Sequence, residues 1–376
     1  MSSNHFVDCW AFLDISEDKF IFLLTIKRQS FILYMKSIPQ RRGKMATIKD
    51  VAKRANLSVS TVSRYLNNHP YVSEERKKRI KEAMEELNYT PSSIATQLRS
   101  KKGTMVGILV SRITNPFFAY LVDAIEKQAK HQGYNVLIMQ TYDDQNAEVK
   151  MLEMLKQQVI TGLIMCSVEG DAKIIESYQE YGPIVFCNEQ IPEAKIPSVV
   201  TNQSQATYEA IQFLIQKGYR KIAYCTGGTL TTKGHGKERT QGFERALLEN
   251  SLPFKKEWVF QQVHTIADGR NVAQQLIDLP SIQRPDAIFT NSDEVAMGVL
   301  EQFQQAGYHI PEDIAIMGFD NQPFTSLLSV PLTTIEQPVE ALGVESTKLL
   351  ISLIESTTYH IDQSQLTLSL IQRASV

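Results

Sequence analysis

From residue 104 onward, short continuous apolar runs alternate with longer segments in which apolar residues return every three or four positions. Continuous apolar runs suit strands that are buried on both faces, and the periodic segments suit helices that cover a sheet. The run 105–110 is the first predicted strand. The segment 115–133 is the first predicted helix, with Pro116 in its first turn and Gly133 at its end. This repetition of strand and helix predicts parallel sheets with right-handed crossovers.

The alternation restarts at a helix predicted over 204–217. We therefore expect two consecutive α/β halves of about 130 residues each within 103–376, with a cleft between them. Open α/β sheets bind ligands at the carboxyl ends of their strands, and two lobes can close around a small molecule. The other predicted strands are 134–141, 161–167, 183–188, 220–227, 257–263, 285–292, 313–321 and 332–338, and the other predicted helices are 147–158, 176–182, 240–250, 267–278, 293–307 and 338–355.

Residues 45–102 have a different pattern, with short amphipathic segments. Thr47, followed three residues later by an acid, is typical of a helix N-cap. Ser58 can cap a second helix at about 59–67. Two short helices joined by three residues indicate a helix-turn-helix, and a third helix is predicted over 75–88. Residues 45–91 are therefore expected to form a separate all-α domain.

The second of these helices carries short polar side chains over most of its surface. Val59, Val62 and Leu66 recur at helical spacing and are predicted to face inward. Short hydroxyls and one arginine suit a helix lying in a DNA major groove, where long side chains would crowd. Arg64 can bond guanine bidentately, and Ser60, with the Val59 side chain, can contact base edges. Phosphate contact is expected from the other outward hydroxyls, Thr61 and Ser63. A Ser-rich surface helix without a DNA role is the alternative.

Charge divides along the same boundary. Residues 45–102 hold 12 Lys/Arg against 6 Asp/Glu, whereas residues 103–376 hold 20 against 31. The composition of the whole chain, 43% hydrophobic and 21% charged, is that of an ordinary globular protein. A basic small module before an acidic large one indicates a polyanionic partner for the small module only.

Residues 1–44 form an N-terminal extension that precedes the basic module. The apolar stretch 20–35 is split by Lys27 and Arg28, so neither half reaches the roughly 18 apolar residues of a membrane span. No small-residue cleavage site follows it, which argues against a signal peptide. Arg-Arg-Gly-Lys directly precedes Met45, and purine-rich codons for these four residues would resemble a ribosome-binding site read as protein. We therefore expect Met45 to be the true start and the extension to be translated upstream sequence.

Cysteine spacing and catalytic motifs give no indication of an enzyme. Cys9, Cys166, Cys187 and Cys225 are far apart, and the last three lie in apolar runs, so we expect buried reduced thiols and no metal site. The sequence shows no nucleophile elbow, P-loop or metal-binding box. We therefore expect neither catalytic residues nor a cofactor.

The N-terminal module resembles a known family. TIKDVAKRANLSVSTVSRYLN (47–67) and VSEERKKRIKEAMEELNYTPSSIATQLRS (72–100) closely resemble the DNA-binding headpiece of the LacI family of bacterial regulators. The resemblance continues through nearly the whole chain from Met45. It implies that 92–102 is a hinge helix that orders on DNA in a dimer, and that Leu98 wedges into the minor groove. A plain linker-helix core is the alternative role of Leu98. The residues expected to contact DNA are Thr47, Ser58, Val59, Ser60, Thr61, Ser63, Arg64, Asn67, Ser92, Ala95 and Leu98.

Candidate ligand-binding residues follow predicted strands or open predicted helices at the cleft. An aromatic pair after the first strand could stack on a sugar or base ring. A guanidinium and two carboxylates, each from the second half, would bind hydroxyls or amines. The candidates are Asn115, Phe117, Phe118, Arg239, Asp293 and Asp320, and the LacI resemblance places effector contacts at the matching positions.

Each charged candidate has a simpler interpretation. Asp293 could be a helix N-cap, Arg239 a surface ion pair, and Asp320 part of a turn. The sequence also departs from the family, because Thr201-Asn202 stands where some members place a ligand-binding Asp. We therefore expect a sugar or sugar phosphate without naming one. The basic residues Lys233, His235 and Lys237 either favour a phosphorylated ligand or belong to a solvated loop.

These features predict a sequence-specific DNA-binding transcription regulator, expected to be a repressor of a carbohydrate-related operon. It would act in the cytoplasm as a homodimer on a palindromic operator, controlled by a small-molecule effector, without a membrane partner. Some members of the family also use a phosphocarrier protein as corepressor. A sugar-binding receptor without a DNA role is the alternative, and the basic headpiece argues against it. An enzyme using Arg239, Asp293 and Asp320 is the third hypothesis.

Overall fold

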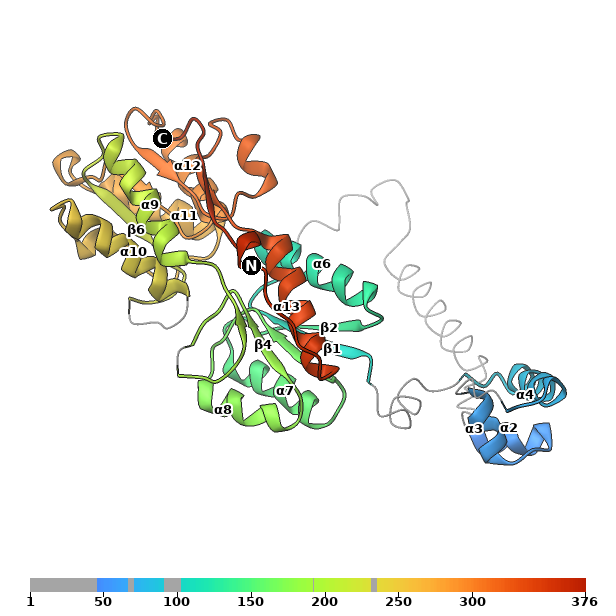
Figure 1. Cartoon of the computed structure of the whole chain (residues 1–376). Coiled ribbons are helices and arrows are strands. Elements are labelled where there is room, and N and C mark those ends of the chain that lie inside the picture. The colour runs from blue at the N-terminus through green and yellow to red at the C-terminus, as the bar shows by residue number, and fades with distance from the viewer. Residues whose placement is uncertain (1–45, 67–70, 91–102, 192, 231–234) are drawn as a thin grey trace, which may run out of the picture. The chain divides into compact units, whose positions relative to one another are not determined.

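The computed structural model describes residues 46–66, 71–90, 103–191, 193–230 and 235–376 (Figure 1). They fall into two compact units, one N-terminal and one C-terminal, and each is described by itself. None of the described helices is long and apolar enough to cross a membrane.

The N-terminal unit consists of α2 (Ile48–Ala55), α3 (Val59–Leu66) and α4 (Glu74–Glu86). The amide and hydroxyl of Thr47 both donate to the Asp50 carboxylate, at 2.8 and 2.7 Å, so the predicted cap is confirmed. The helix-turn-helix arrangement is also confirmed. One small core joins all three helices, and its buried members are Val51, Ala52, Ala55, Val62, Val72, Ile80 and Ala83.

Two predictions for this unit were inaccurate. Helix α4 begins and ends slightly before the predicted 75–88. Val59 was predicted to face inward, yet 41% of it is exposed, whereas Val62 is fully buried. Val59 is the first residue of α3, so no preceding turn of the helix covers it. The hinge helix at 92–102, Asn67, Ser92, Ala95, Leu98 and the extension 1–44 lie outside the described residues.

The C-terminal unit contains two parallel sheets. The first follows the order β2-β1-β3-β4-β5 and the second the order β7-β6-β8-β9. Strand β1 has the predicted bounds, because its run of apolar residues is buried along almost its whole length. The strands of the first sheet are β1 (Met105–Val110), β2 (Asn135–Gln140), β3 (Leu163–Met165), β4 (Ile184–Cys187) and β5 (Ser198–Val199), and those of the second are β6 (Ile222–Cys225), β7 (Val259–Phe260), β8 (Ala287–Phe289) and β9 (Ala315–Met317).

Helices cover both faces of each sheet, as the buried strands require. On the first sheet, α6 (Pro116–His131) packs on one face, and α7 (Gln145–Lys156) with α8 (Ala172–Ser177) packs on the other. On the second sheet, α9 and α10 share one face, and α11 and α12 share the opposite face. These four helices span Gln203–Gln216, His235–Glu249, Ile266–Asp278 and Asp293–Gln305.

The chain crosses between the two halves three times, so the lobes are not consecutive in sequence. Helix α13 (Val339–Ile354) follows the second sheet but packs beside α6 on the first, as Figure 1 shows. The chain then returns, and β11 (Ser369–Ile371) pairs antiparallel with β10 (Thr334–Glu336). We call the first sheet with its helices and α13 the first lobe, and the second sheet with its helices and the β10–β11 pair the second lobe.

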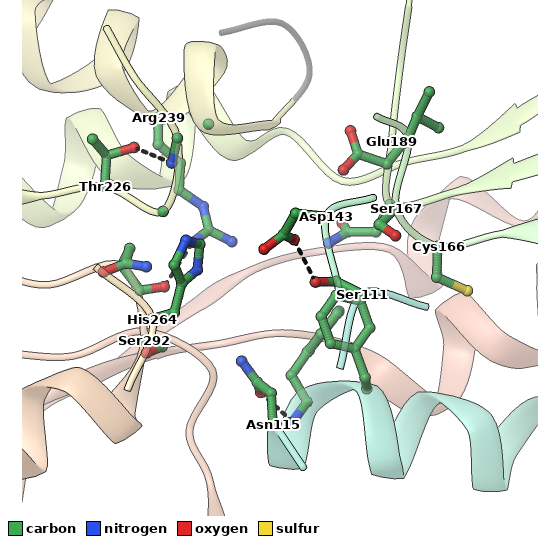
Figure 2. A pocket seen from close by; sticks show the side chains of 18 of the residues that line it. Ser111, Asn115, Asp143, Cys166, Ser167, Glu189, Thr226, Arg239, His264 and Ser292 are labelled. Carbon is green, nitrogen blue, oxygen red and sulfur yellow. Dashed lines mark hydrogen bonds between the residues drawn. The ribbon is translucent and has the colours of Figure 1, made fainter. Parts of the chain in front are cut away.

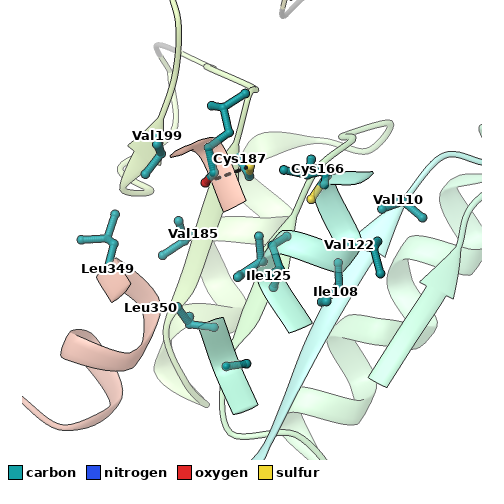
Figure 3. Packing of buried hydrophobic residues seen from close by; sticks show 14 of the residues in the cluster. Ile108, Val110, Val122, Ile125, Cys166, Val185, Cys187, Val199, Leu349 and Leu350 are labelled. Atoms are coloured by element: carbon teal, nitrogen blue, oxygen red, sulfur yellow. Dashed lines mark hydrogen bonds between the residues drawn. The ribbon is translucent and has the colours of Figure 1, made fainter. Parts of the chain in front are cut away.

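This crossing corrects the expectation of two consecutive halves. Leu342, Leu349 and Leu350 of α13 complete the core of the first lobe. Figure 3 shows Leu349 and Leu350 in the same cluster as residues of β1 and β4. The periodic pattern identified a helix at 338–355, but a helical stripe does not say which sheet it covers. Strands β5 and β11 and the antiparallel pairing of β11 were also not predicted. Helix α10 begins before the predicted 240, and the helix predicted at 176–182 overlaps α8 only at 176–177.

The cysteines of this unit behave as expected. Cys166, Cys187 and Cys225 are buried free thiols, and burial raises the pKa of the Cys225 thiol. Cys166 and Cys187 lie in the first-lobe core, where the Cys187 sulfur is 3.8 Å from the Leu342 carbonyl oxygen. Cys9 lies outside the described residues.

Candidate functional site

Helix α3 presents a polar surface. Ser60 and Arg64 are exposed, and Thr61 and Ser63 are partly exposed, as predicted. The Ser58 hydroxyl accepts from the Thr61 amide at 3.1 Å, which fixes the start of the helix. The arrangement leaves one guanidinium among short hydroxyls on an accessible face. Such a face can enter a major groove without steric conflict.

Arg79 on α4 was not identified from the sequence, although it positions this face. Its Nη2 donates to the Ala55 carbonyl at 2.6 Å and to the Asn56 carbonyl at 3.3 Å. Asn56 adopts the left-handed conformation, with φ of 52°, and ends α2. Arg79 therefore holds the turn between α2 and α3 from a helix that is distant in sequence. The only sequence indication was an arginine on the side of α4 that also carries apolar residues.

The C-terminal unit contains a cavity of about 340 Å³ between its lobes (Figure 2). Its walls come from the carboxyl ends of strands in both sheets, where open α/β sheets place their ligands. The volume is in the range of small-molecule sites. The first lobe contributes Ser111, Asn115, Phe117, Phe118, Asp143, Cys166, Ser167, Val168, Glu169, Asn188, Glu189 and Ile191, and the remainder of the wall includes Tyr224, Thr226, Arg239, Gln262, His264, Asn291, Ser292, Asp320 and Gln337.

The predicted residues Asn115, Phe117 and Phe118 form one side of the cavity. Asn115 caps α6, because its Oδ1 accepts from the Phe117 amide at 3.0 Å. Phe117 is buried and Phe118 is partly exposed, and their rings meet edge to face with centroids 5.3 Å apart. Phe117 therefore supports Phe118, whose ring is the one available to a ligand.

Arg239 lies on the opposite wall and is only 6% exposed, so the surface ion pair interpretation is wrong. Its Nε donates to Gln203 Oε1 at 2.8 Å, and its Nη1 donates to the Asn291 carbonyl at 2.9 Å. The guanidinium carbon lies 3.5 Å from the centroid of the Phe319 ring. Burial lowers the pKa of Arg239, and the nearby Asp320 charge opposes that effect. The planar fork is thus held rigidly at the cavity wall.

Asp320 also reaches the cavity, but Asp293 does not. Asp320 is buried at a positive φ of 116°, and its Oδ1 accepts from Gln337 Nε2 at 2.7 Å. Asp293 lies beneath it and is fully buried. It accepts from the Gln322 amide at 2.7 Å and from the Thr334 hydroxyl at 2.6 Å. Asp293 is not the N-cap either, because Ser292 holds that position. Its role in this structure is to fix the loop that carries Asp320.

This burial leads to a prediction of pH dependence. Burial, reinforced by the Asp320 charge, raises the pKa of Asp293 well above its usual value. The folded state then binds the proton more tightly than the unfolded state. This group therefore lowers stability as pH rises from the usual pKa of an aspartate to the raised pKa of Asp293. Asp293→Asn should gain stability relative to wild type over the same interval, with a slope of up to about 1.4 kcal/mol per pH unit. Urea unfolding at a series of pH values measures the difference.

Asp313→Asn is the matched control for that experiment. The His309 amide donates to Asp313 at 2.7 Å and lowers the pKa of this carboxyl group. Its substitution should therefore change stability with pH in the opposite direction. A pH-independent difference between wild type and Asp293→Asn would contradict the prediction.

Several lining residues were not predicted. Asp143 forms an ion pair with Arg112 and accepts from the Ser111 hydroxyl at 2.8 Å. His264 comes from the other lobe, and burial, then the Arg112 charge, lowers the pKa of its imidazole. Glu189 is a buried acid two residues after the end of β4. Each of the three lies shortly after the carboxyl end of a strand. Because open α/β sheets bind ligands at these ends, a search of the residues after every predicted strand would have found them.

Of the basic residues Lys233, His235 and Lys237, only Lys237 has a described side chain. Lys237 is exposed and does not line the cavity. Lys233 and the His235 side chain lie outside the described residues. Thr201 is buried behind the wall, and Asn202 caps α9. Among the residues that the structure describes, no group of three His, Cys, Asp or Glu side chains could hold a metal ion.

Comparison with known proteins gives matches along nearly the whole of 47–374. Residues 47–92 match the model for bacterial regulatory proteins of the lacI family, and residues 103–374 match that for periplasmic binding proteins and the sugar binding domain of the LacI family. The NTD biosynthesis operon regulator NtdR of Bacillus subtilis is 36% identical over 312 residues, covering 83% of this chain and 93% of the relative.

Two solved structures show where the similarity extends. A LacI family transcriptional regulator from Lactobacillus casei with bound sucrose is 40% identical, with a TM-score of 0.69, covering 72% of this chain and 99% of that one. The lac repressor dimer bound to operator and the anti-inducer ONPF is 25% identical, with a TM-score of 0.73, covering 88% of this chain and 99% of that one.

Proposed function

Because the chain belongs to the LacI family, as a DNA-binding transcription regulator with a sugar-binding type of C-terminal domain, we propose that it represses a carbohydrate-related operon under the control of an uncharged polyol. It acts on DNA through α3 as a homodimer, like the lac repressor dimer that occupies an operator. We place its action in the cytoplasm. The match over 47–92 favours this function over a transport receptor.

The charged residues of the cavity wall are the basis for the proposed class of ligand. Asp143, Glu189 and Asp320 line the cavity with Arg239, and Arg112 is paired with Asp143. Carboxylates accept hydrogen bonds from hydroxyl groups, whereas a phosphate among them would meet like charge. The partly exposed Phe118 ring provides an apolar surface for a sugar face. This wall favours a neutral sugar over a sugar phosphate, and the sucrose in the Lactobacillus casei relative is consistent with it.

A comparison of neutral sugars with a phosphorylated sugar tests the ligand class. D-glucose, sucrose and glucose 6-phosphate are titrated against the full-length protein while thermal unfolding is followed, because a ligand that binds only the folded state raises the midpoint. The phosphate ester should bind about tenfold or more weakly than its parent sugar. A larger shift with glucose 6-phosphate would contradict the proposal, as would no shift with any of the three.

Selection of genomic fragments by the purified protein, followed by footprinting, tests the regulatory function. We expect a palindromic site upstream of genes for sugar uptake or catabolism, and steep loss of binding with added salt. Recovery of fragments without a shared sequence would contradict specific operator binding. A phosphocarrier corepressor stays a prediction, and repeating the selection with and without such a protein measures its contribution.

Arg64→Ala should weaken binding to the selected operator by about 1–3 kcal/mol and relax the preference at one base position. The reason is that a bidentate guanidinium discriminates guanine from other bases, and Arg64 is the exposed guanidinium on α3. Competition with operators substituted at each position measures both effects. Arg76→Ala, which removes an exposed arginine from α4, is the matched control and should leave base preference unchanged. Equal base preference in both variants would refute the role of Arg64.

A further inference from the structure

A buried polar network lies directly behind the charged wall of the cavity, and Gln203 is at its centre. Gln203 is the first residue of α9, is 1% exposed and does not line the cavity. Its Oε1 accepts from Arg239 Nε at 2.8 Å. Its Nε2 lies 2.7 Å from Thr201 Oγ1 and 3.1 Å from both Asn188 Oδ1 and Gln337 Oε1, so its two N–H donors are shared among three acceptors. One carboxamide therefore joins four residues.

Two of the four partners of Gln203 lie in segments that cross between the lobes. Thr201 lies between β5 of the first lobe and α9 of the second, in the first crossing of the chain. Gln337 lies between β10 of the second lobe and α13 of the first, in the second crossing. Asn188 follows β4 of the first lobe. The carboxamide thus connects two crossing segments to each other and to the residue that follows the carboxyl end of β4.

The same network reaches both charged residues that face the cavity from the second lobe. Arg239 bonds Gln203 directly. Asp320 accepts from Gln337 Nε2 at 2.7 Å, and Gln337 Oε1 accepts from Gln203. A ligand that moves either charged group therefore changes a hydrogen bond made by a crossing segment.

Only a carboxamide meets both requirements at position 203. The guanidinium of Arg239 needs an acceptor, whereas the oxygens of Asn188 and Gln337 need a donor. A carboxylate would keep the first bond and lose the donors, and an aliphatic side chain would lose both. Unpaired buried polar groups cost about 1–3 kcal/mol each, so the network resists partial rearrangement.

We propose that Gln203 is a positioning residue that couples the ligand-facing Arg239 and Asp320 to the segments crossing between the lobes, so that the state of the cavity sets the lobe arrangement and hence operator affinity. This inference rests on the proposed effector control of DNA binding. It assigns to Gln203 a role that needs no contact with the ligand. In thermodynamic terms, Gln203 carries part of the coupling free energy between the two sites.

Substitution of Arg239 serves as the probe in place of a ligand. Arg239→Lys keeps the charge but removes the Nε–H group that donates to Gln203, which imitates a ligand that draws the guanidinium away. Operator affinity of the ligand-free, full-length dimer is measured for wild type, Arg239→Lys, Gln203→Leu and the double variant, on the operator fragment recovered by genomic selection. If Gln203 transmits the change, Arg239→Lys should shift operator affinity about fivefold or more in the wild-type background. The shift should be less than about twofold in the Gln203→Leu background.

Gln203→Glu provides a second test that survives if Gln203→Leu fails to fold. It has the same shape and retains the acceptor for Arg239, but it cannot donate to Asn188 or Gln337. We expect it to shift operator affinity about fivefold by itself. Gln205→Glu makes the same chemical change two residues further along α9, outside the network, and should have no such effect.

Thermal unfolding of every variant separates coupling from a merely structural role. A variant that unfolds at a lower temperature but binds operator as wild type does would overturn the proposal. Equal shifts from Arg239→Lys in both backgrounds would overturn it as well. Failure of the genomic selection would instead count against the proposed function, because no specific operator would then exist to be measured.

Discussion

Gly298→Ala is expected to destabilise the protein by about 3 kcal/mol or more, an unusually large effect for one methyl group. Gly298 lies in α12 where it crosses α11. A Cβ at this position would be 2.0 Å from the Ile266 carbonyl oxygen and 3.1 Å from the Arg270 amide. Both contacts are with backbone, so no side chain can rotate to relieve them.

The contact is reciprocal, which makes relaxation expensive. Gly269 of α11 faces α12 in the same way, and a Cβ there would be 2.2 Å from the Val295 carbonyl oxygen. The two helices therefore touch through backbone on both sides. Accommodating alanine requires α11 and α12 to separate, which opens the core that they form with β8 and β9.

Urea unfolding of the full chain, at fixed protein concentration, measures the loss. Gly236→Ala is the matched control, because it is also a helical glycine and its added Cβ would have its nearest neighbour at 3.9 Å. That substitution should be neutral or stabilise by up to about 1 kcal/mol, through helix propensity. If Gly298→Ala unfolds at the wild-type urea concentration, the close approach of α11 and α12 is refuted.

Arg239→Lys is expected to reduce effector affinity by about 100-fold, equivalent to roughly 2.7 kcal/mol. The charge is retained, so the loss would come from geometry. The guanidinium is fixed by Gln203, by the Asn291 carbonyl and by the Phe319 ring. A lysine ammonium cannot make these three contacts together, and it has no planar fork to present to the cavity.

Titration calorimetry with the sugar that most raises the wild-type unfolding temperature measures this loss. Lys237→Ala is the control, because Lys237 is an exposed cation two residues away on the same helix and does not line the cavity. We expect its affinity to match wild type. Similar losses in both variants would indicate a general effect of positive charge near α10 rather than a contact made by Arg239.

The local pattern of the chain determined most of the elements. The run 105–110 is a strand with the predicted bounds, because continuous burial requires continuous apolar residues. Thr47 and Ser58 begin helices as predicted, because capping depends on residues only three positions apart. The same locality explains the helix-turn-helix. It also explains why Asn115, Phe117, Phe118, Arg239 and Asp320 were found, since each lies just after a strand or near the start of a helix.

Only the tertiary structure decided which elements meet. The amphipathic pattern of α13 is the same whichever sheet it covers, and its place on the first lobe depends on contacts with α6 and β4. Asp293 has the sequence position of a cavity residue, yet the Asp320 loop folds over it and turns it into a buried support. Gln203 is an ordinary helix residue in the sequence, and its role depends on Asn188, Arg239 and Gln337, which are 15, 36 and 134 residues away. Helix caps and strand bounds depend on neighbouring residues, whereas burial and long-range hydrogen bonds arise only once distant segments are packed together.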